Sequence, residues 1–205
     1  MSNENIQLVS FVLDNSASVS KEKLSALMGG FRRLAAEREK YPAMEWELLS
    51  FDGFAPAVIK SFDTEEILPV RAGRMPLLAR AMQSAAVRLT ARAEALEKEG
   101  KAPYRPWLFV LSDGFSFDEP ALVAATLDAW EKGGKILYLP FRLSAKLYNE
   151  RMQAMDRVKH MITVKDGGIE SFFAFFTSLL ARRSEAGGEG ALKFRKNDFE
   201  GWAEL

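Results

Sequence analysis

The stretch Leu8–Ser20, with the sequence LVSFVLDNSASVS, decides the fold of this chain of 205 residues. Its first half is almost continuously apolar, which is typical of a parallel strand that is buried on both faces. The strand then stops at Asp14, and Ser16 and Ser18 follow at alternate positions. In an open parallel sheet, ligands bind at the carboxyl ends of the strands. The sequence therefore predicts a carboxylate and two hydroxyls at that edge, all of them hard oxygen donors of the kind that magnesium prefers.

The composition excludes several classes of function. Lysine plus arginine and aspartate plus glutamate number 28 each, so the overall charge does not favour nucleic acid or an acidic membrane surface. The absence of cysteine rules out disulfides, thiolate metal sites and cysteine nucleophiles, and it suits a reducing compartment. The first residues do not resemble a secretory signal, and no stretch approaches the roughly 20 apolar residues that span a bilayer. We therefore expect a cytoplasmic protein that binds neither nucleic acid nor membrane.

A second stretch repeats the opening pattern. Residues 107–114, WLFVLSDG, form another apolar run that stops at an acid, Asp113. Further strands are expected at 44–51, 55–62, 135–141 and 160–164. Helices are expected from Ser20, as a cap, to before Pro42, at 76–98, from Asp118 or Glu119 to Trp130, at 143–155 and at 169–180. The strands 44–51 and 55–62 must be antiparallel because only a few residues join them. This order predicts a doubly wound α/β sheet.

Two local features leave alternatives open. Gly29 and Gly30 lie inside the first expected helix, where each costs roughly 1 kcal/mol relative to alanine. Either close packing against the sheet or a kink would explain the pair. Near the end of the chain, residues 184–190 are charged and glycine-rich and are expected to form a linker after a domain at 1–183. The tail 191–205 alternates large apolar residues with charges, so it should dock on this domain or on another chain.

The motif Asp14-x-Ser16-x-Ser18, together with Leu111-Ser112-Asp113-Gly114, resembles the von Willebrand factor A (vWA) domain. The resemblance implies a mostly parallel six-stranded sheet of order 3-2-1-4-5-6 with one antiparallel edge strand. It also implies a metal-ion-dependent adhesion site in which Asp14, Ser16, Ser18 and Asp113 hold magnesium or manganese. One coordination position then stays open for an acidic residue of a protein partner. A Gly-x-x-Pro-Leu stretch before a long helix is similar to bacterial stand-alone members, including those of tellurite-resistance clusters.

The chain departs from the family pattern at Met75, which stands where the family has a metal-binding threonine. A thioether is a soft and weak donor, which makes it a poor magnesium ligand. Three outcomes stay open: the ion binds more weakly with water in that place, the guanidinium of Arg74 replaces the ion between the two aspartates, or the site is inert. Asn15 and Asp52 are expected beside the site.

Three functions follow from these residues. The expected one is a non-enzymatic, metal-dependent protein-interaction module. The second is a scaffold of the same fold that binds without metal, through the rim of the crevice or the tail. The third is a magnesium-dependent phosphohydrolase, for which the sequence offers neither a second acid near Asp14 nor an evident general base, since the single histidine, His160, is expected to be structural. No glycine-rich phosphate-binding motif is present, and the oligomeric state is open.

Overall fold

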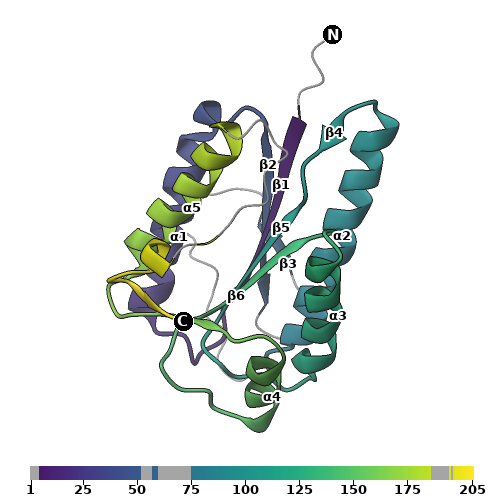
Figure 1. Cartoon of the computed structure of the whole chain (residues 1–205). Helices are drawn as coiled ribbons and strands as arrows, with labels where there is room; N and C mark the ends of the chain where they lie inside the picture. The colour runs from purple at the N-terminus through teal and green to yellow at the C-terminus, as the bar shows by residue number, and fades with distance from the viewer. Residues whose placement is uncertain (1–4, 52–56, 60–74, 186–193, 195) are drawn as a thin grey trace.

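A central sheet lies between two layers of helices (Figure 1). The computed structural model describes residues 5–51, 57–59, 75–185, 194 and 196–205. Within these ranges the helices α1 (Lys21–Ala36) and α5 (Ile169–Glu185) cover one face of the sheet. The helices α2 (Leu78–Lys98), α3 (Pro120–Lys132) and α4 (Glu150–Val158) pack on the other face. None of the helices in the described ranges is long and apolar enough to cross a membrane.

The strand order confirms the predicted α/β sheet. The described strands run β3-β2-β1-β5-β6-β7-β8, with β2, β1, β5, β6 and β7 parallel and β3 antiparallel to β2. The sequence does not predict two further strands: β4, which pairs with the start of β1, and β8, which is antiparallel to β7. The bounds are β1 Asn5–Asp14, β2 Met44–Phe51, β3 Ala57–Ile59, β4 Ala102–Pro103, β5 Trp107–Ser112, β6 Leu137–Arg142, β7 Ile162–Val164 and β8 Ala203–Glu204.

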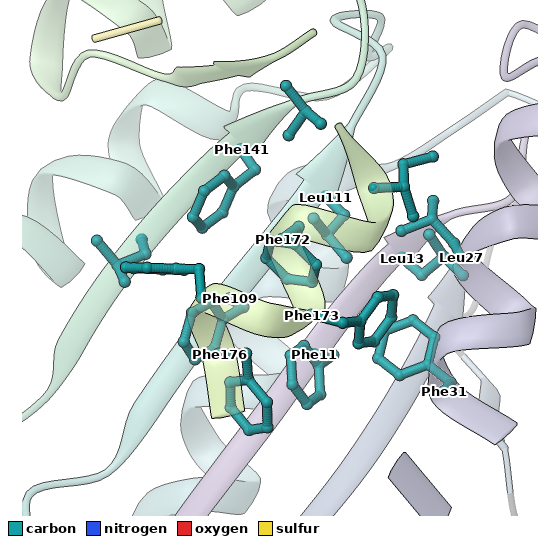
Figure 2. Packing of buried hydrophobic residues seen from close by; sticks show 14 of the residues in the cluster. Phe11, Leu13, Leu27, Phe31, Phe109, Leu111, Phe141, Phe172, Phe173 and Phe176 are labelled. Atoms are coloured by element: carbon teal, nitrogen blue, oxygen red, sulfur yellow. The ribbon is translucent and has the colours of Figure 1, made fainter. Parts of the chain in front are cut away.

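Strand β1 is buried on both faces, as its near-continuous apolar sequence predicts. Val9, Phe11 and Leu13 point into the core under α1 and α5, whereas Leu8 and Val12 point into the core under α2, α3 and α4. Aromatic rings dominate the first of these cores (Figure 2). The ring of Phe11 meets the rings of Phe31, Phe109 and Phe176 at centroid distances of 5.0 Å, 5.2 Å and 5.1 Å. Such pairs add stability beyond that of the buried area.

Close packing, rather than a kink, explains the glycine pair of α1. A Cβ atom on Gly30 would lie only 1.9 Å from the ring of Phe173 in α5, whereas a Cβ on Gly29 would meet nothing closer than 4.0 Å. Helix α1 continues unbroken through both residues, and Ser20 caps it by accepting a hydrogen bond from the backbone N–H of Lys23, as predicted. Gly30 is therefore the position that lets α1 and α5 approach each other.

The end of the chain packs on the same domain. After a short 3₁₀ turn, Lys196–Asp198, the side chains of Phe199 and Trp202 enter the aromatic core and β8 pairs with the edge of β7. The indole N–H of Trp202 donates to the carbonyl oxygen of Asp198, 2.9 Å away. Most of the expected linker and the first residues of the tail lie outside the described residues, so the division at 183 and 190 stays a prediction.

Several expected bounds are wrong. Helix α2 begins at Leu78, not at residue 76, and the segment 143–149 is not helical because α4 begins only at Glu150. Helix α3 begins at Pro120 with Glu119 at its N-cap position, as predicted, but no side chain forms a capping hydrogen bond there. Instead, the carboxylate of Asp118 caps α2, accepting hydrogen bonds from the backbone N–H groups of Ala79 and Arg80 at 2.9 Å and 3.0 Å.

Candidate metal centre

The two motif aspartates meet at the carboxyl ends of the two central strands. Strands β1 and β5 are parallel neighbours, with Leu13 opposite Leu111, so Asp14 and Asp113 follow at the same edge. Helix α1 leaves β1 toward one face of the sheet, and α3 leaves β5 toward the other. This is the topological switch point of a doubly wound sheet, where a crevice opens for a ligand.

The carboxyl group of Asp14 is fully buried and held from both sides. Its Oδ1 accepts a hydrogen bond of 2.9 Å from the backbone N–H of Ser16, and its Oδ2 accepts one of 2.9 Å from the hydroxyl of Ser112. Burial, and after it the charge of Asp113, raises the pKa of the Asp14 carboxyl to about 7, although the hydrogen bonds from Ser16 and Ser112 act in the opposite direction. Without a cation, Asp14 therefore keeps its proton at pH values where an ordinary aspartate is ionised.

Asp113 brings a second buried carboxylate with one oxygen unused. Its Oδ1 accepts a hydrogen bond of 3.2 Å from the backbone N–H of Phe115, but its Oδ2 is buried and has no hydrogen-bond partner among the described residues. The next residue, Gly114, has a φ of +102°, and a Cβ there would lie 2.8 Å from the carbonyl oxygen of Lys146. Only glycine therefore allows the chain to turn directly after Asp113 and to pack under the loop 143–149.

The serines of the first motif also converge. The hydroxyls of Ser16 and Ser18 lie 2.7 Å apart; Ser16 is buried, whereas Ser18 is exposed to solvent. Asn15, which follows Asp14 in the chain, is buried, and its Oδ1 has no hydrogen-bond partner among the described residues. The fold thus brings together Asp14, Ser16, Ser18 and Asp113, with Asn15 beside them.

The remaining predicted residues fall into two groups. Met75 precedes α2 and its side chain is 43 % exposed. Asp52 and Arg74 lie outside the described residues, so the arginine substitute stays a prediction.

The donor set fits a hard divalent cation. Carboxylate and hydroxyl oxygens are the ligands that magnesium and manganese accept, and each Asp14 oxygen keeps a lone pair beside the hydrogen bond it already makes. The described residues contain no group of three or more histidine, cysteine, aspartate or glutamate side chains that could hold a metal ion. With two carboxylates and a methionine at position 75, the part of the chain that the structure describes supplies few strong ligands. Such a site would bind its ion weakly and complete the coordination with water.

Sequence reasoning missed three residues that shape the site. The hydroxyl of Ser112 donates to Asp14, a role that its place in the second motif did not predict. Ser116 is fully buried, and its hydroxyl lies 2.6 Å from Asp118 Oδ1 and 3.3 Å from the backbone nitrogen of Leu78. Together with Asp118, it fastens the loop after β5 to the first turn of α2. The position of Ser112 directly before Asp113 was a usable signal, whereas nothing local to residues 116 and 118 indicates a distant helix.

The raised pKa of Asp14 predicts that stability depends on pH when metal is absent. An aspartate in the unfolded chain ionises near pH 4, so the fold takes up a proton between that value and about 7. The stability contributed by the neutral carboxyl is complete below about pH 4 and is lost as the pH rises through 7. In a chelator, we expect the native protein to lose stability between about pH 5 and pH 8 relative to Asp14→Asn, which cannot ionise.

Urea unfolding of both proteins at the two pH values measures this difference. Parallel pH profiles would show that Asp14 ionises normally in the fold.

Comparison with known proteins adds little beyond the geometry. No protein-family model matches the sequence, and no curated protein matches it. Among solved structures, the chain is similar to the manganese-loaded TRAP protein of Plasmodium vivax, with a TM-score of 0.47 and 14 % sequence identity. The similarity covers 76 % of this chain and 63 % of that chain, so this chain spans less than two thirds of its length.

Proposed function

We propose that this chain is a non-enzymatic protein-interaction module that binds a partner through a divalent cation held at the carboxyl ends of β1 and β5. One observation carries the proposal. The Oδ2 atom of Asp113 is buried without a hydrogen-bond partner among the described residues, close enough to the buried Asp14 to raise the pKa of that carboxyl. Two buried carboxylates repel each other, and a cation between them relieves both the repulsion and the unmet acceptor.

The partner follows from the charge balance of such a site. Asp14 and Asp113 neutralise a divalent ion, while the serine hydroxyls are neutral, so a coordination position facing solvent suits another oxygen donor. An acidic side chain of a second protein is the ligand that the vWA resemblance implies. This proposal includes three finer points. The chain is akin to stand-alone bacterial vWA proteins of tellurite-resistance clusters, it is located in the cytoplasm, and its ion is magnesium or manganese.

The test is thermal unfolding in a chelator and in millimolar magnesium or manganese. A metal at ~100 times its dissociation constant adds ~2.7 kcal/mol of stability, which is roughly 5–10 °C for a chain of this size. We expect this rise in the native protein, its loss in Asp113→Asn, and a larger rise in Met75→Thr, which supplies a hard oxygen. Asp166→Asn is the matched control because Asp166 is a solvent-exposed carboxylate that pairs with Lys23.

The outcomes separate the proposed function from its alternatives. A rise that persists in Asp113→Asn would place the ion elsewhere. No rise in the native protein would favour the metal-independent scaffold, and the rim of the crevice would then be the binding surface, because Phe199 and Trp202 of the tail are buried in the domain's own core. Turnover of a phosphate ester that is abolished in Asp14→Ala would support the phosphohydrolase instead.

A further inference from the structure

We infer that the partner of this site is a protein segment in which the acidic residue stands beside a large apolar side chain. The inference rests on the proposed function, because the acidic residue is the one that reaches the ion. It adds a second point of contact, an apolar rim formed by Met75, Phe117 and Tyr148. These three side chains are 43 %, 41 % and 53 % exposed.

The rim lies directly around the loop that carries Asp113. The backbone N–H of Tyr148 donates to the carbonyl oxygen of Gly114 at 3.0 Å, and the backbone N–H of Phe117 donates to the carbonyl oxygen of Pro76 at 2.9 Å. Backbone hydrogen bonds therefore hold the segments that carry Tyr148, Phe117 and Met75 next to one another. The described part of the chain exposes seven large apolar side chains, and three of them fall on these joined segments.

The rim is also held rigidly. Ser116 and Asp118 bind the loop after β5 to the first turn of α2, and the side-chain amide of Asn149 donates to the carbonyl oxygen of Ser116 from the start of α4. The ring of Phe117 meets the ring of Phe115 edge to face at 5.0 Å. A surface whose backbone is already fixed loses little conformational entropy on binding.

The chemistry of the surface selects the occupant. Asp113 and the three exposed apolar residues stand on segments that are joined by backbone hydrogen bonds. A partner segment that reaches both the proposed ion and the rim must therefore offer a carboxylate and, next to it, an apolar side chain. Met75 contributes to this choice, since this exposed apolar residue stands where the vWA resemblance implies a hydroxyl. A purely acidic segment would satisfy the ion but leave the rim exposed to water.

The test compares three synthetic peptides: acetyl-Ala-Phe-Asp-Leu-Ala-amide, the same peptide with alanine on both sides of the aspartate, and the apolar peptide with asparagine in place of aspartate. Their affinities are measured by isothermal titration calorimetry in manganese and in a chelator. We expect the first peptide to bind about tenfold more tightly than the second in manganese, because one apolar side chain becomes buried. The asparagine peptide should not bind.

Two variants test whether the rim causes the preference for the first peptide. Phe117→Ser should remove most of the difference between the first two peptides while leaving the affinity for manganese alone unchanged. Val87→Ser is the matched control, because Val87 is 59 % exposed but lies more than two turns along α2 from its start.

Each outcome bears on one of the two ideas. Equal affinities for the first two peptides in manganese, or no binding of either, would overturn the inference about the partner and leave the metal response as a separate result. A preference for the first peptide that persists in the chelator and is lost in Phe117→Ser would support the rim and overturn the metal-dependent function.

Discussion

Replacing Trp202 by alanine is expected to lower the free energy of unfolding by about 3–5 kcal/mol, which is roughly 6–20 °C in melting temperature. The indole is 7 % exposed, and its ring lies 5.5 Å from that of Phe175 and 5.8 Å from that of Phe199. Its removal leaves a cavity at the edge of the aromatic core and takes away the side chain that packs directly before β8. Urea or thermal unfolding in a chelator measures the loss without any contribution from metal.

Leu205→Ala is the matched control for the tail. Leu205 is also a large apolar residue, three positions further on, but its side chain is 62 % exposed and its loss should be nearly neutral. A change of less than about 1 kcal/mol in Trp202→Ala would show that the tail does not dock on its own domain in solution. The metal-independent alternative that uses the tail would then regain support.

Replacing Gly30 by alanine is expected to cost about 3 kcal/mol, although alanine is the better helix former. The new Cβ would lie 1.9 Å from the Phe173 ring, and that ring is itself packed against Phe31 and Phe172, so any movement of the ring disturbs those contacts. Helices α1 and α5 would have to separate. The free energy of unfolding in urea measures the cost.

Gly29→Ala is expected to change the free energy of unfolding in the opposite direction from Gly30→Ala. A Cβ there meets nothing closer than 4.0 Å, so the variant should gain up to about 1 kcal/mol from helix propensity. Equal effects of the two substitutions would contradict the close approach of α1 to α5.

The parts of the fold that follow from the sequence are those with a dense local signal. The apolar run of Leu8–Leu13 and the similar run before Asp113 predicted buried central strands, and the short connection after Phe51 predicted the antiparallel β3. Their order in the sheet came from the vWA resemblance, and with it the meeting of Asp14 and Asp113. Local sequence alone does not determine which strands are neighbours, because strand pairing is a long-range contact.

Most of the misses share one physical cause, which is that a tertiary contact outweighed local propensity. The segment 143–149 has apolar residues that suit a helix, but the chain there packs on Gly114, and Tyr148 donates to the carbonyl oxygen of that glycine. Asn149 caps α4 through a hydrogen bond from the backbone N–H of Met152, and this cap was a readable signal for the true start of the helix. Strand β8 had no such signal, because two residues in a charged tail form a strand only where β7 leaves an edge open.

The cap that Asp118 places on α2 also sets an order of events in folding. It joins groups 39 residues apart in sequence, so closing that loop has an entropic cost that a local cap does not have. Asp118 follows β5 in the chain, so we expect it to reach the helix only once β5 has paired with β1. The first turn of α2, next to the crevice, is therefore completed after the central strands have paired, and we expect amide hydrogen exchange to be faster at Ala79 and Arg80 than in the middle of the same helix.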